Sequence, residues 1–276
     1  MLIRCWGARG SIPVSGWQYL WYGGDTPCIE VRTKDDDIVI IDAGSGIRRL
    51  GNLLLAEGRN RYTMIFTHVH WDHVMGFPYF KPIYHRETHI DFFGSPSARD
   101  SVRNLISGIM SPPNFPVKFE DITAEIDYRE VHRSPIQIGS LTITPIPLSH
   151  PNQGMGYRLE EDGKSFVFLT DNELTFRHPG GMAYEDYCEF SKGADLLVHD
   201  AEYRAEEYRR TRTWGHSVYT DALRLAVDAG AMTLGLYHHN QERTDQDLEA
   251  MVEDCRRTAG RSLSCFAMRQ DMEIVI

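Results

Sequence analysis

The sequence lacks the long apolar run that a membrane-spanning helix requires. Crossing a bilayer takes about 20 consecutive apolar residues, and no stretch of the 276 residues approaches that length. The first residues, Met1 to Gly7, also lack the apolar segment of a secretory signal and are typical of a first strand. We therefore expect a cytoplasmic protein with no membrane partner.

Paired cysteines are missing as well. The chain has five cysteines, an odd and scattered set without a C-x-x-C pair, at Cys5, Cys28, Cys188, Cys255 and Cys265. Such a set gives no disulfide framework. It is typical of reduced, mostly buried thiols, which agrees with a cytoplasmic location.

The sequence also lacks a basic tract, and its formal net charge is -10. A protein that follows a long phosphate backbone normally carries a basic face, because counterion release supplies much of its affinity. The densest basic cluster, residues 209–212, directly follows Glu206 and Glu207, and we expect it to lie in a solvated, self-paired loop or helix end. The charge argues against a long nucleic acid as partner, whereas a small anion remains compatible.

Nothing in the sequence resembles a linker or a low-complexity segment, so we predict a single domain over residues 1–276. Mixed α/β domains often reach this length undivided. Strand-like and helix-like runs alternate in two passes, and each half is expected to supply a sheet covered on one side by helices. The expected strands cover 28–33, 37–41, 62–67, 89–93, 140–149, 156–160, 165–170 and 195–199, and the expected helices cover 45–57, 97–109, 217–229 and 245–258.

Three histidines and an aspartate stand within six residues, directly after the apolar run over 62–67: His68, His70, Asp72 and His73. The run is typical of a buried strand, so these side chains project beyond the sheet edge. Buried imidazoles each need a partner, which a metal ion supplies. His68 and His70 share a face of extended chain, whereas Asp72 and His73 follow where the chain turns. Two differently aimed pairs favour two adjacent ions over the alternative of a solvated polar loop.

Three later strand-like runs also lead into residues of a metal-binding type. The run over 143–149 precedes His150, the run over 165–170 precedes Asp171, and the run over 232–237 precedes His238. Taken singly, such residues are more often surface residues or satisfied core residues. Their serial position after strands favours a shared site, with His239 as the adjacent alternative to His238.

This pattern resembles the metallo-β-lactamase superfamily, which draws its metal ligands from successive strand ends. The resemblance implies an α/β fold of the four-layer αββα type, in which two sheets stack face to face between helices. It implies one ion held by His68, His70 and His150, a second held by Asp72, His73 and His238, and Asp171 as a bridge. The family's ligand comes first after the strand, which favours His238 over His239.

Three residues are expected behind these ligands: Asp42, His199 and His239. Asp42 opens the segment over 42–46, which follows a strand and opens a helix but lacks the lysine of a P-loop and the full dinucleotide fingerprint. In the superfamily the equivalent aspartate lies beneath the metals and orients a ligand histidine. An aspartate in a plain tight turn is the alternative that the sequence leaves open.

Two further loops, over residues 197–203 and 214–217, resemble those of the ribonuclease Z branch. In that branch they set a carboxylate and a histidine beside the metals, where the histidine contacts the scissile phosphate and the pair assists proton transfer. The resemblance gives these roles to Asp200 and His216, and counts Asp72 as a third catalytic residue. Asp200 stands where ribonuclease Z commonly has glutamate, which shortens the reach by one methylene. His216 can also simply precede Ser217 as a helix N-cap.

Over essentially the whole chain, the sequence resembles a bacterial group described as class II cyclic-AMP-phosphodiesterase-like, most clearly in residues 7–13, 22–28 and 76–80. Two places depart from the group's pattern. Asp25 stands where asparagine is expected, and Asn240-Gln241 stands where Asp-Pro is expected.

The aromatic and proline-rich segment over 110–116 allows two interpretations. Together with Phe77 and Tyr79 it caps the cleft, as long loops often do at functional sites, or it is plain packing. The sequence leaves the role of the loop over 107–117 open.

The expected chemistry follows from the ligands that the resemblance implies. Ligation by nitrogen and oxygen alone suits zinc, with manganese or iron as alternatives. Two divalent cations lower the pKa of bound water from about 15.7 to about 7, which gives metal-bound hydroxide near neutral pH. The cations and His216 stabilise charge on the non-bridging phosphate oxygens.

We therefore predict a dinuclear-metal phosphodiesterase that cleaves a small cyclic or linear phosphodiester of the cyclic-nucleotide type. A ribonuclease Z-like endoribonuclease is the first alternative, disfavoured because the stretch between Asp171 and His199 is too short for that branch's tRNA-gripping arm. A thioester or lactam hydrolase of the same fold and a non-catalytic binding module are the others. A homodimer is compatible with the sequence.

Overall fold

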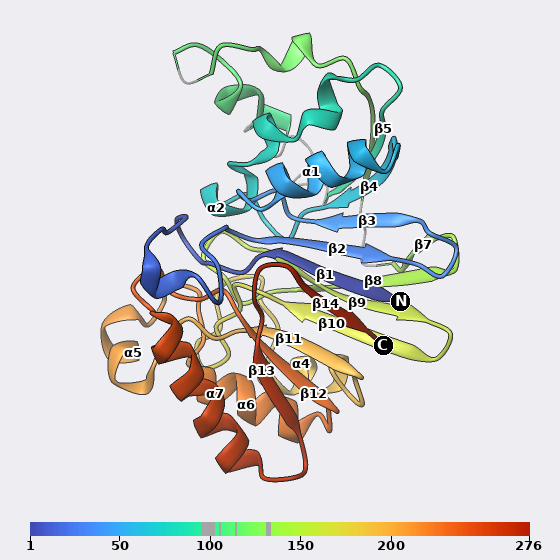
Figure 1. Cartoon of the computed structure of the whole chain (residues 1–276). Helices are drawn as coiled ribbons and strands as arrows, with labels where there is room; N and C mark the ends of the chain where they lie inside the picture. The colour runs from blue at the N-terminus through green and yellow to red at the C-terminus, as the bar shows by residue number, and fades with distance from the viewer. Residues whose placement is uncertain (95–102, 105, 114, 131–133) are drawn as a thin grey trace.

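The computed structural model describes residues 1–94, 103–104, 106–113, 115–130 and 134–276. In this part of the chain two seven-stranded sheets pack face to face, with helices on their outer faces (Figure 1). The predicted αββα sandwich is thus confirmed. Its helices are α1 (Ile47–Ala56), α2 (Trp71–Val74), α4 (Tyr184–Phe190), α5 (Ala205–Thr211), α6 (Tyr219–Asp228) and α7 (Asp245–Ala259), with short 3-10 turns at Trp17–Tyr19, Phe77–Tyr79, Lys81–Tyr84 and Phe119–Asp121.

The first sheet has the strand order β14-β1-β2-β3-β4-β5-β6. Neighbouring strands are parallel from β3 to β6 and antiparallel from β14 to β3. The strands are β1 (Leu2–Gly7), β2 (Cys28–Arg32), β3 (Ile38–Ile41), β4 (Arg61–Ile65), β5 (His89–Gly94), β6 (Glu125–Glu130) and β14 (Met272–Val275).

The second sheet has the order β13-β12-β11-β10-β9-β8-β7. It is an antiparallel meander from β7 to β10 and parallel from β10 to β13, so that β8, β10 and β12 all run in the same direction. The strands are β7 (Ile136–Ile138), β8 (Leu141–Pro147), β9 (Met155–Glu161), β10 (Lys164–Leu169), β11 (Leu196–Asp200), β12 (Thr233–Tyr237) and β13 (Ser264–Ala267).

One strand crosses between the halves of the chain. The sequence pattern assigns one sheet to each half, but β14, from the end of the chain, pairs antiparallel with β1 in the first sheet. The two chain ends therefore lie together, and the Met1 amino group donates to the Ile276 carbonyl at 3.3 Å. The added strand covers the edge that β1 would otherwise present to solvent.

Three apolar clusters fill the three interfaces between the four layers. Strand β10 illustrates how the sequence produces them, because its side chains alternate between the two faces of the sheet. Phe166 and Phe168 point toward the first sheet, whereas Val167 and Leu169 point toward α6 and α7. All four side chains are fully buried. A strand covered on both faces explains why its sequence is a continuous apolar run.

Two sequence expectations need separate comment. The helix expected over 97–109 lies partly outside the described residues; of its described part, residues 103–104 and 106–109 are helical. In the proposed cap, Asn114 lies outside the described residues, and Phe77 is fully buried against Phe92 in the layer around α1. Phe77 is therefore core packing, because its ring faces the sheet. None of the helices in the described ranges is long and apolar enough to cross a membrane.

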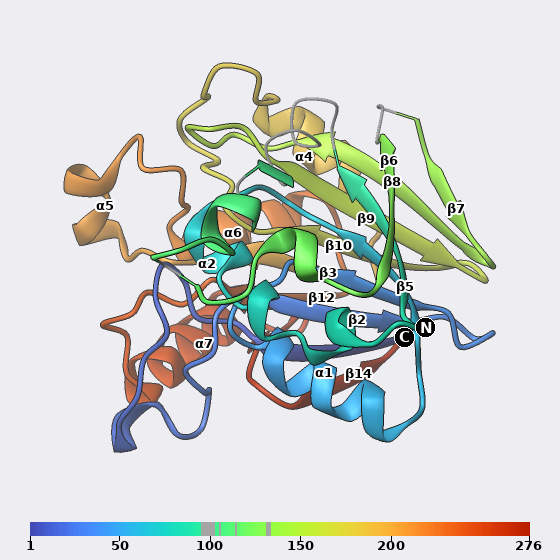
Figure 2. The same cartoon turned by 90° about the horizontal axis from the view of Figure 1, so that it is seen from above.

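The strand directions bring the chemistry to one end of the sandwich. α2 follows β4 of the first sheet, and α5 follows β11 of the second. Both helices lie at the end opposite the chain termini (Figures 1 and 2). Loops that follow strands of both sheets therefore meet at this end.

Truncating Phe168 should reveal how much the packing between the sheets contributes to stability. Phe168→Ala removes a fully buried ring that packs edge-on against Tyr237 and should lower the free energy of unfolding by about 3–5 kcal/mol. Denaturant titration followed by circular dichroism measures this. Val275→Ala, at a side chain 78% exposed, is the control and should change stability by less than about 0.5 kcal/mol. A loss below 1 kcal/mol for Phe168→Ala would contradict this account of the core.

Candidate metal centre

The chain beyond β4 places four predicted ligands at the edge of the first sheet. His68 is buried, and its ring lies against that of His70 with centroids 4.6 Å apart. His70 keeps an extended backbone and precedes α2, whose single turn carries Asp72 and His73 into the interior. The structure thus agrees with the predicted split between an extended pair and a pair in the following turn.

Strand-end loops of the second sheet bring the remaining ligands. His150, Asp171 and His238 lie just beyond β8, β10 and β12, and all three are buried. Asp171 and His238 adopt left-handed backbone conformations, with φ of 52° and 57°. Residues other than glycine seldom adopt this conformation, although aspartate and histidine tolerate it best. It turns each chain sharply at the strand end and leaves the side chain in the shared centre.

The converging side chains form two groups joined by Asp171. In the first group, His150 Nε2 lies 3.0 Å from His70 Nδ1, and His68 Nε2 lies 3.5 Å from Asp171 Oδ1. In the second, His73 Nε2 lies 3.4 Å from Asp72 and 3.2 Å from Asp171. Asp171 therefore reaches both groups.

His238 completes the second group. Its Nε2 lies 3.1 Å from Asp72 Oδ2 and 3.3 Å from Asp171 Oδ1. Ligand atoms around a tetrahedral ion bound at about 2.0–2.1 Å are about 3.3 Å apart. The spacing of the donor atoms therefore suits metal ions between them.

Unsatisfied atoms and charges also fit cations at this place. The Nε2 atoms of His68 and His73 are buried, and no hydrogen-bond partner for them is found in the described part of the chain. Burial lowers the pKa of His150 to about 3 and lowers that of His68, which keeps both imidazoles neutral with free lone pairs. Burial opposes charge on His73 and His238 too, but the carboxylates of Asp171 and Asp72 outweigh it and raise both pKa values. The buried carboxylates thus favour positive charge at this place, which divalent metal ions would supply.

The second ring nitrogen of His68, His73 and His150 is anchored by a hydrogen bond. Nδ1 of His73 donates to Asp42 at 2.8 Å, and Nδ1 of His68 donates to Thr67 Oγ1, which itself donates to Asp42. Nδ1 of His150 donates to the Gly215 carbonyl at 3.0 Å. Such partners fix the ring orientation and the tautomer, so that Nε2 faces the centre. Asp42 lies where the sequence analysis placed it, behind a predicted ligand.

Unlike Asp42, His199 and His239 make no hydrogen bond to a predicted ligand in the described part of the chain. His199 accepts from Asn172, and Asn172 in turn accepts from the Ser149 backbone; both neighbours adjoin predicted ligands. His199 thus supports two ligand loops indirectly. His239 faces the other way, and its Nε2 donates to the Met268 carbonyl at 2.7 Å.

Asp200 and His216 form a hydrogen-bonded pair beside the centre. Nδ1 of His216 donates to Asp200 Oδ2 at 2.7 Å, and Asp200 Oδ1 accepts from the Ser217 backbone at 2.9 Å. The His216 ring stacks on that of His238 with centroids 4.7 Å apart. The reach of Asp200 is sufficient despite its shorter side chain, because the loops that carry it and His216 lie in direct contact.

Two buried carboxylates at the site were missed by the sequence analysis. Glu202 accepts from His238 Nδ1 at 2.9 Å and anchors that ring. Glu173 accepts from the backbones of Thr213 and Gly215 and from the side chains of His178 and Tyr208. Each follows a predicted site aspartate by two residues. That spacing was the available signal.

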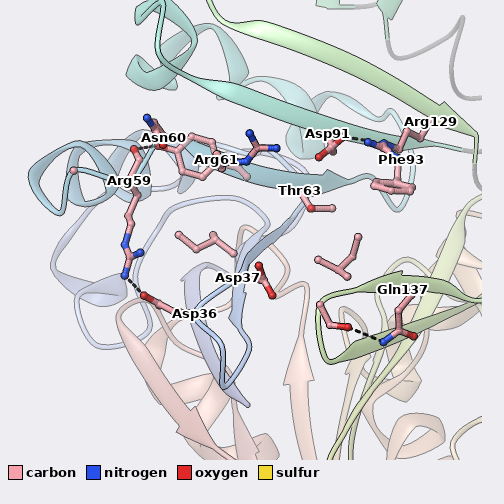
Figure 3. A pocket seen from close by; sticks show the side chains of 15 residues that line it. Asp36, Asp37, Arg59, Asn60, Arg61, Thr63, Asp91, Phe93, Arg129 and Gln137 are labelled. Carbon is pink, nitrogen blue, oxygen red and sulfur yellow. Dashed lines mark hydrogen bonds and ion pairs between the residues drawn. The ribbon is translucent and has the colours of Figure 1, made fainter.

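Two cavities differ in their relation to this centre. One of about 500 Å³ lies at the start of β4, the far end of that strand from the histidines (Figure 3). Its charged side chains largely pair with one another, as in Arg59 with Asp36 and Arg129 with Asp91. The other cavity, of about 820 Å³, is lined by His216 and Glu202. The second cavity therefore adjoins the chemistry.

Comparisons with known proteins agree with this geometry. Residues 38–239 match the family model described as "Beta-lactamase superfamily domain". Ribonuclease Z of Haloarcula marismortui is 26% identical over 270 residues, covering 81% of this chain and 83% of the relative. The metallo-beta-lactamase fold protein YhfI from Bacillus subtilis has a TM-score of 0.72 at 16% identity, covering 99% of this chain and 98% of that one. Unliganded yeast PDE1 has a TM-score of 0.72 at 12% identity, covering 100% and 99%. The chain therefore belongs to the metallo-β-lactamase superfamily of hydrolases.

Proposed function

We propose that the protein is a dinuclear-metal phosphodiesterase for a small phosphodiester. The observation that carries the proposal is a histidine with a carboxylate partner, His216 with Asp200, directly beside a cluster that suits two cations. A phosphodiester needs cations and a donor for its non-bridging oxygens, together with a proton for its leaving group. This site combines a cluster that suits two cations with an imidazole that can donate a hydrogen bond or a proton.

In this proposal His68, His70 and His150 would hold one ion, Asp72, His73 and His238 would hold the other, and Asp171 would serve both, because its carboxylate lies near His68, His73 and His238. Divalent ions so held acidify water and polarise phosphoryl oxygens. Nitrogen and oxygen donors suit zinc, manganese or iron. The anchored Nδ1 atoms keep the ligand rings in place without reorganisation.

His216 supplies the proton in this proposal. Burial lowers its pKa, but the carboxylates of Glu202 and Asp200 outweigh burial and raise the pKa to about 9. The imidazole thus holds a proton near neutral pH, and Asp200 fixes its orientation through Nδ1. Nε2 is left to donate to a phosphate oxygen or to the departing oxygen.

Ribonuclease Z-like activity is the second candidate, favoured by the relative from Haloarcula marismortui that carries this name. Two features of the chain favour the small substrate instead. The net charge is -10, and the segment between Asp171 and β11 holds only the seven-residue helix α4. A structured RNA would have to bind without an extended basic arm from this segment.

Replacing Asp171 should weaken both metal sites together. Asp171→Asn removes the negative charge that lies 3.5 Å from His68 and 3.2 Å from His73, so occupancy should fall in both groups. Metal analysis of protein reconstituted and then dialysed gives the stoichiometry, which should be two per chain in the unaltered protein. Retention of one full equivalent in the variant would make Asp171 a ligand of a single ion. Asp162→Asn, at an exposed carboxylate paired with Lys34, is the control.

Removing the imidazole of His216 should reduce turnover while leaving the metals bound. We expect His216→Ala to lower kcat by about 10²- to 10⁴-fold, the range of lost acid or base assistance, because no predicted ligand depends on its Nε2. The loss should be smaller for a p-nitrophenyl ester, whose leaving group needs little protonation. Metal loss in step with activity would instead identify His216 as a ligand.

Salt dependence should separate a small substrate from a structured RNA. A protein that makes many phosphate contacts loses affinity by orders of magnitude over a modest range of salt, whereas a diester held mainly at the metal centre should be affected only weakly. Steady-state rates on a cyclic nucleotide and on a tRNA precursor, each at low and high salt, provide the measurement. Efficient, salt-sensitive cleavage of the tRNA with poor turnover of cyclic nucleotides would favour the ribonuclease.

A further inference from the structure

The cavity of about 820 Å³ beside His216, here called the side pocket, has the size of a small-molecule site. Its walls come from the end of α5, from the loop before His216 and from the residues that follow β12. Ser11 also lines it, and the Ser11 backbone donates to the predicted ligand Asp72 at 2.8 Å. A group attached to a phosphate at the metal centre can therefore extend into this pocket.

Several polar groups in the walls are already engaged. Glu202 accepts from His238 and from the Asn240 amide, and Glu207 pairs with Arg243 at 2.6 Å. Tyr203 is buried, with its ring set edge-on against that of His216. These residues form the fixed part of the wall.

Four other side chains in the lining remain available to a ligand. The indole of Trp214 is 61% exposed. Gln241 Oε1 is buried, and it has no hydrogen-bond partner within the described ranges. Glu206 and Arg210 have no ion pair with any residue that the structure describes, although the sequence suggested that this segment pairs with itself. The pocket therefore offers a ligand one aromatic face, one amide acceptor, one positive charge and one negative charge.

The charges of the lining narrow the class of ligand. Glu207 is paired with Arg243, and Glu202 faces His238 and His216, which leaves Glu206 and Arg210, among the described residues, as one unpaired charge of each sign. The described lining therefore has no cluster of free cations to hold a second phosphate group. A cage for a quaternary ammonium uses several aromatic faces, whereas only Trp214 offers a largely exposed ring here. Stacking on one aromatic side chain together with hydrogen bonds at the ring edge is how proteins hold an unpaired nucleobase.

We propose that the side pocket is a subsite for a nucleobase with an exocyclic amine, stacked on Trp214 and donating to Gln241 Oε1. The proposal rests on the proposed function, because it names the organic group of the phosphodiester whose phosphate lies at the metal centre.

The test uses the metal-loaded protein and p-nitrophenyl phosphodiesters that differ only in their second substituent, which is methyl, choline, 5′-adenosyl, 5′-cytidyl or 5′-uridyl. Trp214→Ala should raise KM for the adenosyl ester about tenfold, as expected for one lost base stack, and leave kcat and the methyl ester unchanged. Gln241→Leu should remove the preference for the cytidyl over the uridyl ester, since the two bases differ by an amine against a carbonyl. Trp17→Ala, at an indole 84% exposed outside the pocket, is the matched control and should change neither.

A second measurement does not depend on turnover. Calorimetry should show that adenosine 5′-monophosphate binds more tightly than ribose 5-phosphate, and that Trp214→Ala removes the difference. Base-dependent binding without hydrolysis of any ester would keep the subsite and overturn the proposed reaction. Hydrolysis with equal KM for methyl and adenosyl esters, together with equal binding of the two monophosphates, would overturn the subsite alone. A preference for the choline ester that depends on Trp214 would overturn the nucleobase subsite in favour of a site for a cationic group. If no ester is hydrolysed and binding does not depend on the base, both proposals are overturned.

Discussion

The carboxylate of Asp171 lies within 3.5 Å of imidazole nitrogens of three histidines from two segments of the chain, His68 and His73 after β4 and His238 after β12. This contact unites the two halves of the sandwich, since His68 and His73 follow β4 of the first sheet and Asp171 follows β10 of the second. Buried groups of this kind are costly unless their charge is compensated. The stacking of the sheets and the electrostatics of the site therefore depend on each other, and cations bound at this place would stabilise both.

Around that contact, hydrogen bonds hold the rings before any substrate arrives. Gly215 shows how closely the parts are coupled, because its carbonyl accepts from His150 while its backbone N–H donates to Glu173. A Cβ at Gly215 would lie 2.0 Å from His150 Nδ1, so glycine is required for this approach. The loop that carries His216 is thereby fixed to a predicted metal ligand. Preorganisation of this kind lets the site act on a developing charge without first rearranging.

The side pocket lies on one side of the cluster of predicted ligands, next to His216. It is lined by His216, Trp214 and Gln241, so the phosphodiester proposed above would present its phosphate from one side. The remote cavity at the start of β4 has no comparable connection, because the whole length of the strand separates it from the histidines. Position relative to the strand ends therefore distinguishes the two cavities more clearly than their size does.

The αββα fold was predicted through the resemblance of the sequence to the metallo-β-lactamase superfamily. The serial placement of candidate ligands after strands was predicted from the sequence alone, because apolar runs that end in His or Asp are local patterns. The strand ends before His68, His150, Asp171 and His238 were predicted from such patterns. Tertiary structure alone decided which groups stand behind those ligands. Glu202 anchors His238 across 36 residues of chain, and His150 is anchored by a backbone carbonyl that has no side-chain identity to read. It also decided that β14 joins the first sheet and that Phe77 belongs to the core, since pairing and burial depend on residues distant in the chain.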